Sequence, residues 1–203
     1  MLTGRPVRIL ASAAVVVVAV AASLILASKL VPALPTINDP GLDHWAPGHR
    51  NLTVSDRTGD PAWHAAISQG VATWAGAGTD LRLTLVTQTG ACRQDIDVIE
   101  ICARSQTRIA TREIPGEQGA VDPKANKGHE LHSVDIVVCA DCPLDQPRRV
   151  IIATHEIGHA LGLPHNGSEF SVMFPEGGPF GPDAQDLEIL RSKDGIAAPR
   201  PGG

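Results

Sequence analysis

The chain has 203 residues, a formal net charge of -5 and charged residues at 19%. This length suits one domain or two small ones, and it excludes a tandem array or a large multidomain machine. Because no excess of basic residues is present to hold a polyanion, we expect no nucleic-acid partner. We also expect the protein to be a monomer. Aromatic residues make up only 3% and tyrosine is absent, so the core must be built from Val, Ile, Leu and Ala.

An uncharged apolar run near the N-terminus predicts an export element. Ile9–Ser28 contains no charged residue and is bounded by Arg5 and Arg8 before it and Lys29 after it. A stretch of about 18 or more apolar residues can span a bilayer, whereas the core of a signal peptide has about 7 to 15. The length therefore favours a single-pass anchor with a cytoplasmic N-terminus. Small residues within the run, among them Ala27, leave a cleaved signal peptide open, in which case the protein is secreted.

These features divide the chain into four parts. Residues 1–30 are the signal anchor or signal peptide, and residues 31–42 form a tether rich in proline. We expect one folded domain over residues 43–195 and a flexible tail over residues 196–203. Either version of the export element places the domain outside the cytoplasm.

Apolar spacing and turn residues predict a mixture of strands and helices in the domain. Asp60 and Pro61 are the cap and first residue of a helix, and Asp145 is a plausible cap for another. Gly162 and Pro164 end that second helix. The predicted strands are Asn51–Ser55, Leu81–Thr87, Ile96–Ile101, Thr107–Ile114 and Val134–Cys139, the predicted helices are Pro61–Ala75, Pro147–Leu161 and Pro182–Arg191, and we expect Pro115–His132 to be a surface loop.

Four cysteines in the exported part predict two disulfides, because oxidation is the default there. They are Cys92, Cys102, Cys139 and Cys142. Three pairings are possible, and short separation favours Cys92 with Cys102 and Cys139 with Cys142. A redox role for the C-x-x-C motif and a four-cysteine zinc site are the alternatives, but the βαβ pattern typical of a redox motif is missing.

The segment from His155 to His165 predicts a zinc site. His155 and His159 are four residues apart, so on a helix their imidazoles lie on one face and can reach one ion. Gly162 permits a sharp exit that returns His165 to the same point. Three neutral imidazoles leave a fourth position for water, the arrangement of a catalytic zinc, which lowers the pKa of that water to about 7. Glu156 would lie beside the metal-bound water as its general base.

The pattern H-E-x-x-H-x-x-G-x-x-H resembles the metzincin signature, which a Met-turn follows. Ser171–Pro175 stands where that turn is expected. The sequences of Leu163–His165 and Met173–Pro175 are most similar to the matrixin branch, the matrix-metalloproteinase-like peptidases. The resemblance implies an α+β, metzincin-like zincin fold. In that fold a twisted mixed β-sheet is combined with an active-site helix and a C-terminal helix.

The same resemblance implies roles for residues after the third histidine. Met173 would form a hydrophobic floor under the imidazoles without binding the metal. Phe174 and Pro175 would line the pocket for the side chain after the cleaved bond. Asp186 matches an acid that braces the backbone of the Met-turn, although a plain helix-surface acid is an equal alternative.

Other patterns of the family are missing or weak. The chain has no Pro-Arg-Cys-Gly-type cysteine switch and no recognisable structural-zinc or calcium loop, so a calcium ion is unsupported. His129 and His132 are interpreted as solvent-facing loop residues. The Asn-x-Ser/Thr matches at Asn51 and Asn166 are weak indications of glycosylation.

These observations predict a zinc-dependent endopeptidase that acts outside the cytoplasm on protein or peptide substrates. We expect the substrate to lie extended along an edge strand within Thr107–Ile114. A non-catalytic surface module with a structural zinc is one alternative, although such a site has no use for Glu156. A zinc amidase or other hydrolase that acts on cell-wall peptides is another.

Overall fold

The computed structural model describes residues 44–46, 49–79, 81–93, 95–105, 119–127, 129–175, 178 and 181–193. Several predicted features lie outside these residues: the signal anchor or signal peptide (1–30), the tether (31–42), the strand at 107–114 and the tail (196–203). Among the residues that are described, no helix is both long and apolar enough to cross a membrane.

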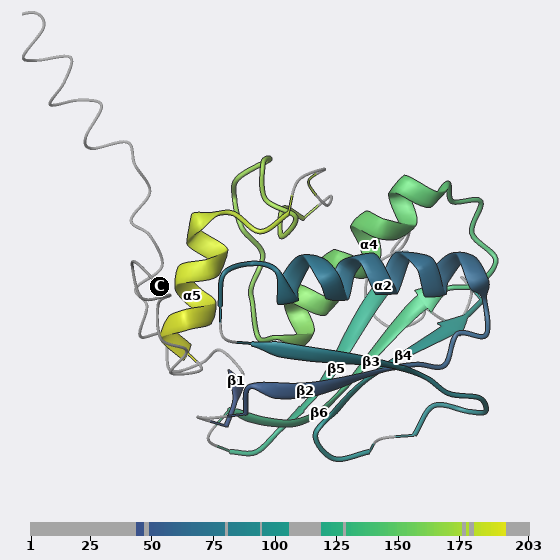
Figure 1. The fold of residues 1–203 in the computed structure, drawn as a ribbon, viewed down its shortest axis with the longest axis horizontal. Helices are drawn as coiled ribbons and strands as arrows, with labels where there is room; N and C mark the ends of the chain where they lie inside the picture. Colours follow the sequence, from purple (N-terminus) through teal and green to yellow (C-terminus); the bar gives the residue numbers. More distant parts are fainter. Residues whose placement is uncertain are drawn as a thin grey trace, which may run out of the picture. The chain divides into compact units, whose positions relative to one another are not determined.

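The described residues form one sheet of six strands (Figure 1). The hydrogen-bonded order is β1-β6-β4-β2-β3, with all of these pairs parallel, and β5 pairs with β6 in the antiparallel direction. The mixed sheet and its helices confirm the predicted α+β fold class. The strands are β1 His44–Trp45, β2 Asn51–Asp56, β3 Arg82–Thr87, β4 Val98–Arg104, β5 Gly119–Ala125 and β6 Glu130–Cys139.

Three helices belong to the described part: α2 Pro61–Ala75, α4 Gln146–Ala160 and α5 Ala184–Lys193. The capping predictions are confirmed, since the Asp60 side chain accepts from Ala62 N at 2.8 Å and the Asp145 side chain from Arg148 N at 2.9 Å. Helices α2 and α4 pack against each other on one face of the sheet (Figure 1).

The strand predictions differ from the structure mainly around β5. The prediction of a loop over residues 115–132 is wrong, because β5 and the start of β6 lie within them. The β5 sequence contains Gly119, Asp122, Pro123 and Lys124, which have low strand propensity. Pairing with the long apolar strand β6 overrides that propensity, and Pro123 is tolerated because β5 has no strand on its other side among the described residues. Strand β4 also begins two residues later than expected.

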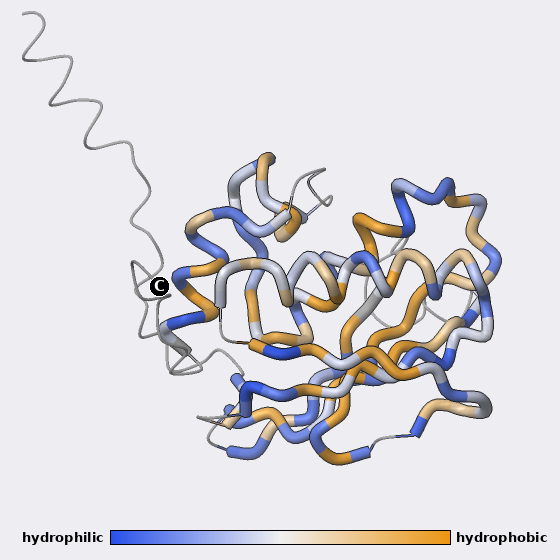
Figure 2. Tube along the Cα trace, in the orientation of Figure 1, coloured by the Kyte–Doolittle hydropathy of each residue, from blue (hydrophilic) through white to orange (hydrophobic). Residues whose placement is uncertain are grey.

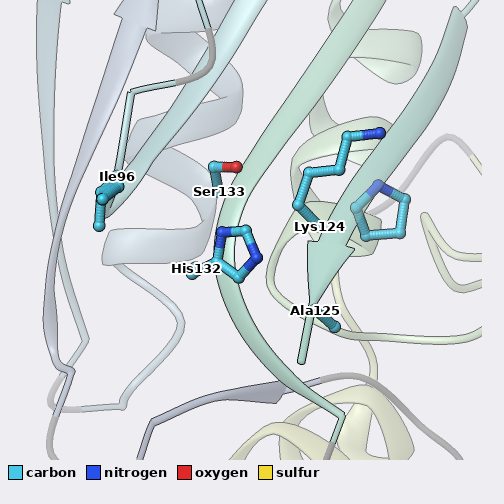
Figure 3. A pocket seen from close by; sticks show the side chains of 6 residues that line it. Ile96, Lys124, Ala125, His132 and Ser133 are labelled. Atoms are coloured by element: carbon cyan, nitrogen blue, oxygen red, sulfur yellow. The ribbon is translucent and has the colours of Figure 1, made fainter. Parts of the chain in front are cut away.

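A bulge in β5 adjoins a hollow on the sheet. The register with β6 shifts between Lys124 and Ala125. The hollow has a volume of about 390 Å³, and its lining residues are Ile96, Pro123, Lys124, Ala125, His132 and Ser133 (Figure 3). His132 is exposed as predicted, but it lies on β6 and not in a loop, because the antiparallel pairing extends the strand past it.

The apolar core lies between the sheet and the two helices. Figure 2 shows hydrophobic residues concentrated along the strands, with hydrophilic residues in the connecting loops. Branched aliphatic residues dominate the buried set, as the composition predicts, but the three tryptophans are its largest members. Trp45, Trp63 and Trp74 are all fully buried.

Each tryptophan also donates one hydrogen bond to a backbone carbonyl, on α4 for two of them and at the end of β6 for the third. The indole Nε1–H of Trp74 donates to Thr154 O at 2.8 Å, and that of Trp45 donates to Ala160 O at 2.9 Å. The indole of Trp63 donates to Cys139 O at 2.9 Å, at the end of β6. Buried indole groups need such partners. The bonds therefore hold α4 near its middle and at its C-terminal end.

A glycine lets α2 approach α4 closely. A Cβ atom at Gly70 would lie 3.1 Å from Ile157 Cδ1 and 3.2 Å from Thr154 Cα, which is tighter than ordinary contact. A larger residue at this position would push the two helices apart. The close approach also brings Trp74, one turn further along α2, within reach of the Thr154 carbonyl.

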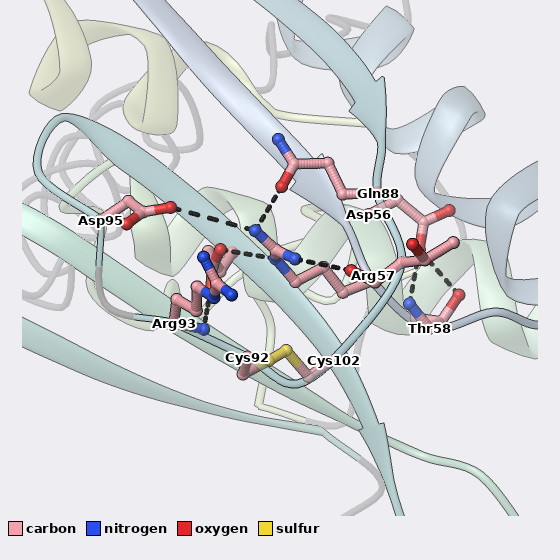
Figure 4. A network of polar contacts seen from close by, with 10 residues as sticks. Asp56, Arg57, Thr58, Gln88, Cys92, Arg93, Asp95 and Cys102 are labelled. Atoms are coloured by element: carbon pink, nitrogen blue, oxygen red, sulfur yellow. Dashed lines mark hydrogen bonds and ion pairs between the residues drawn. A yellow bond between two sulfur atoms is a disulfide. The ribbon is translucent and has the colours of Figure 1, made fainter.

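A buried ion pair and a disulfide fix the connection between β3 and β4 (Figure 4). Glu100 is 1% exposed and accepts from Arg57 Nε at 2.7 Å. The same guanidinium donates to Thr89 O at 3.1 Å and to the side chain of Gln88. Cys92 and Cys102 are paired, which ties the connection to β4 a second time.

Replacement of Trp45 by Phe should destabilise the protein. The variant keeps an aromatic ring but removes the N–H that satisfies Ala160 O, one of the last carbonyls of α4. We expect the free energy of unfolding, measured by urea denaturation, to fall by about 1–3 kcal/mol. Phe170→Leu is the control, because Phe170 is 63% exposed and its replacement should change stability by less than about 0.5 kcal/mol. Equal stability of Trp45→Phe and the parent would contradict this assignment.

Candidate metal centre

Helix α4 carries the first two predicted ligands and ends in a turn that positions the third. Leu163 N donates to Gly158 O at 3.1 Å and Gly162 N donates to His159 O at 2.9 Å, the bond pattern of a Schellman motif. Gly162 has a φ of 91°, a backbone conformation that favours glycine. The chain therefore turns sharply after α4, and His165 follows three residues later.

The structure brings the three imidazoles together. Their ring centroids are 4.6 Å apart for His155 and His159, 4.7 Å for His159 and His165, and 5.3 Å for His155 and His165. One nitrogen from each ring lies within 4.8 Å of the other two. His155 is buried, His159 is half-buried and His165 is exposed, so the cluster opens to solvent on the side of His165.

Backbone carbonyls fix the orientation of two of these rings. The Nδ1–H of His155 donates to Val172 O at 2.6 Å, and the Nδ1–H of His159 donates to Leu163 O at 2.8 Å. The proton on Nδ1 leaves Nε2 as the lone-pair nitrogen in each ring. A histidine that binds a metal through one ring nitrogen usually donates such a hydrogen bond from the other.

The imidazole geometry fits a zinc ion. The Nε2 atoms of His155 and His159 are 3.0 Å apart, although both carry lone pairs. Zinc–nitrogen bonds of about 2.0–2.1 Å in a tetrahedron separate two nitrogens by about 3.3 Å, close to the observed value. A cation between the lone pairs removes their repulsion. The residues present therefore form a zinc centre with three protein ligands, in agreement with the prediction.

Burial also keeps these ligands in the form that binds metal. Removal from water lowers the pKa of His159 to about 4, and it lowers the pKa of His155 as well. Mutual repulsion between the imidazoles when charged acts in the same direction. Both rings are thus neutral near pH 7, as zinc ligands must be.

Glu156 lies on α4 directly after the first ligand. Its side chain is only 8% exposed. The first residue of β5, Gly119, lies against this side chain. Glu156 is therefore enclosed between α4 and the sheet, next to the metal ligands.

The turn predicted to contain Met173 packs against α4 at Gly158, between the two helical ligands. Phe174 N donates to Ser171 O at 3.1 Å, which closes a tight turn. Met173 is fully buried. A Cβ atom at Gly158 would overlap the sulfur of Met173 and would lie 2.7 Å from Trp74 Cζ2. Glycine at position 158 thus allows the turn and α2 to pack against α4 between the two ligands.

A buried carboxylate connects this turn to α5. Asp186 is 1% exposed and accepts from Ser171 Oγ at 2.6 Å. The same hydroxyl oxygen accepts from Met173 N at 2.9 Å. Asp186 therefore braces the Met-turn, as the family resemblance implies, and the alternative of a surface acid is wrong.

Sequence reasoning missed the structural part played by Asn166. Its side chain is 4% exposed, and Nδ2 donates to Asp186 Oδ1 at 2.9 Å and to Asp183 Oδ1 at 3.0 Å. Its backbone N–H donates to Met173 O at 2.8 Å. The nitrogen that a glycan would need is thus engaged in the fold. In the sequence, the only indication of this role is that Asn166 directly follows the third ligand, His165. The residue pattern at Asn166 otherwise indicates only a glycosylation site.

The other predicted site residues lie outside this cluster. Phe174 is half-buried and Pro175 is exposed, both at the end of the Met-turn. In the described residues, neither His129 nor His132 belongs to a group that could hold a metal ion. Cys139 and Cys142 form a second disulfide between β6 and α4.

A protein-family model matches the part of the chain that contains all of the residues of the metal centre. The matrixin family model matches residues 106–188, which contain the three imidazoles, Glu156, the Met-turn and Asp186. This segment of the chain is similar to the matrixin family. The chain is also 60% identical to human matrix metalloproteinase-26 over 25 residues, a match of 12% of this chain and 10% of that protein. The matched segment thus spans about a tenth of that relative.

Three solved structures also resemble parts of this chain. Archaemetzincin from Methanopyrus kandleri has a TM-score of 0.44 and 14% identity, over 71% of this chain and 96% of that one. Myroilysin has a TM-score of 0.37 and 16% identity, over 60% and 44%. High choriolytic enzyme 1, a hatching-enzyme zinc protease from Oryzias latipes, has a TM-score of 0.33 and 13% identity, over 63% and 52%.

Replacement of Asp186 by Asn should loosen the Met-turn. The carboxylate accepts from Ser171 Oγ, Asn166 Nδ2 and Asp183 N, and an amide nitrogen cannot replace an acceptor. We expect a loss of about 1–3 kcal/mol in the free energy of unfolding. Zinc affinity should also fall, since the Val172 carbonyl that orients His155 belongs to the same turn.

Chemical denaturation and zinc titration would measure the two effects. Glu188→Gln is the matched control, because Glu188 lies on the exposed face of the same helix. If Asp186→Asn matched this control in both stability and zinc affinity, the brace would have no energetic significance.

Proposed function

We propose that this chain is a matrixin, a zinc-dependent endopeptidase that cleaves protein or peptide substrates outside the cytoplasm. The observation that carries the proposal is the combination of three converging imidazoles with the enclosed carboxylate of Glu156 next to them. A structural zinc site is usually closed by four protein ligands. The three-ligand cluster leaves a coordination position for chemistry.

Glu156 is proposed as the general base and acid of the reaction. When bound, zinc lowers the pKa of water at the site to about 7 and polarises a carbonyl oxygen. The Glu156 carboxylate accepts a proton from the water that adds to the peptide carbonyl carbon. It then delivers this proton to the amine nitrogen as the carbon–nitrogen bond breaks. Tyrosine cannot assist, because the chain contains none.

The edge strand next to Glu156 is the proposed docking site for substrate. Strand β5 is antiparallel to β6 and, among the described residues, has no partner on its other side. Its first residue lies against the Glu156 side chain. An extended peptide that added to this edge through main-chain hydrogen bonds would pass the catalytic groups. This proposal replaces Thr107–Ile114 with Gly119–Ala125 as the expected docking strand.

The residues after the Met-turn are proposed to select the substrate side chain. Met173 supports the imidazoles from below, and Phe174 and Pro175 contribute to the pocket for the residue that follows the cleaved bond. Their positions at the end of the turn that packs against α4 at Gly158 support this assignment.

Replacement of Glu156 by Gln tests the proposed reaction. The variant keeps the size of the side chain but cannot accept the proton, so kcat should fall at least about 100-fold. Zinc content should stay near that of the parent, because Glu156 does not bind the metal. Glu169→Gln is the control, since Glu169 is exposed. Retained peptide hydrolysis in Glu156→Gln would exclude Glu156 as the base.

A peptide library incubated with and without a zinc chelator separates the remaining alternatives. Hydrolysis of ordinary peptides that the chelator abolishes and added zinc restores supports an endopeptidase. Cleavage confined to cell-wall peptides would instead indicate an amidase. No cleavage by the zinc-loaded protein would indicate a non-catalytic binding module.

We further propose that the catalytic domain is tethered to a membrane by residues 9–28. The two disulfides fit an oxidising compartment, and matrixins are extracellular. The uncharged run is long enough to span a bilayer, which favours retention over cleavage. Secretion after removal of a signal peptide is the alternative.

The N-terminus of the mature protein distinguishes these two routes. Mass spectrometry of the protein purified from its host should find residues 9–28 retained and the protein in the membrane fraction. An N-terminus after Ala21 or Ala27, with the protein in the medium, would show that the segment is a cleaved signal.

A further inference from the structure

Only glycine fits at position 119 while the Glu156 side chain keeps its present conformation. A Cβ atom at Gly119 would be 2.6 Å from Glu156 Oε1, 2.8 Å from Cγ and 2.9 Å from Cδ. Real Cβ atoms essentially never come within 3.0 Å of such atoms. All three of these nearest atoms belong to the Glu156 side chain. The contact is therefore specific to the proposed general base.

Conformational freedom does not explain the glycine at this position. Gly59, Gly78 and Gly90 have φ between 66° and 102°, and a Cβ atom at any of them would have nothing within 4 Å. Gly119 shows the opposite combination, because it is absent from the residues with positive φ but has no space for a side chain. Its backbone could accommodate alanine, whereas its surroundings could not.

Both backbones at this contact are held by neighbouring elements. Gly119 pairs with Val138 at the C-terminal end of β6, the long buried strand of the sheet. Helix α4 is held by the bond from Trp74 to Thr154 O, two residues before Glu156. A side chain at position 119 would therefore be accommodated by movement of the Glu156 carboxylate, which is the end of a flexible side chain.

We propose that Gly119 is a positioning residue for the general base: its missing side chain makes the space in which the Glu156 carboxylate is held beside the zinc ligands. This inference rests on the proposed peptidase function for its catalytic consequence. The contact itself does not depend on that function. Small displacements of a catalytic group are costly, since proton transfer requires hydrogen-bond distance to the reacting water.

Gly119→Ala tests the catalytic consequence. We expect kcat for a peptide substrate to fall at least tenfold, while KM and the zinc content stay within twofold of the parent. Gly167→Ala is the matched control, because nothing lies within 4 Å of a Cβ atom there and its φ is not positive. A loss of zinc in Gly119→Ala, or an unchanged kcat, would overturn the proposal.

A double-mutant cycle tests the contact without any activity measurement. Glu156→Ala removes all three atoms that a Cβ at position 119 would meet. Gly119→Ala should therefore raise the urea midpoint in the Glu156→Ala background, by restricting the unfolded chain, but should not raise it when Glu156 is present. The metal-free protein serves for both arms. Equal midpoint shifts in the two backgrounds would overturn the proposal.

The two experiments separate failure of this inference from failure of the proposed function. If the parent protein hydrolyses no peptide, the endopeptidase proposal fails, and the coupled midpoints still decide whether Gly119 positions Glu156. If Gly119→Ala alone does not fold, rescue by Glu156→Ala supports the contact, and absence of rescue contradicts it.

Discussion

The attachment of α4 to its surroundings is the constraint on which the metal centre depends. Two of the three zinc ligands and the proposed base are on this one helix, so an error in its position would displace all of them together. Close packing at Gly70 and the bond from Trp74 to Thr154 O fix the helix near its middle. The bond from Trp45 to Ala160 O fixes its end, where the chain turns toward His165.

The local part of the site could be predicted from the sequence, because helical geometry places residues four apart on one face. His155, Glu156 and His159 follow from that rule, and Gly162 indicated the turn that returns the chain to the cluster. Strand β5 could not be predicted, because its pairing with β6 is tertiary and its own residues have low strand propensity. The contact between Gly119 and Glu156 was hidden for the same reason, since it joins residues 37 positions apart in the sequence.

The second half of the site depends on hydrogen bonds that residue patterns do not specify. Asp186 on α5 reaches Ser171, and Ser171 in turn holds Met173. Asn166 closes the same network from the segment that carries His165. The family resemblance indicated Asp186, but nothing local distinguished Asn166 from a surface asparagine. Buried polar networks of this kind act as units, so their members support the ligands although they do not touch the metal.

The distribution of aromatic residues has a consequence for spectroscopy. The chain has three tryptophans and no tyrosine, and every indole donates to a carbonyl between Cys139 and Ala160. Intrinsic fluorescence therefore originates from groups in contact with α4 or with the end of the strand that leads into it. Trp74 is also adjacent to Gly158, between the two helical ligands. The emission spectrum of the unlabelled protein should thus report directly on the integrity of the helix that carries two of the zinc ligands.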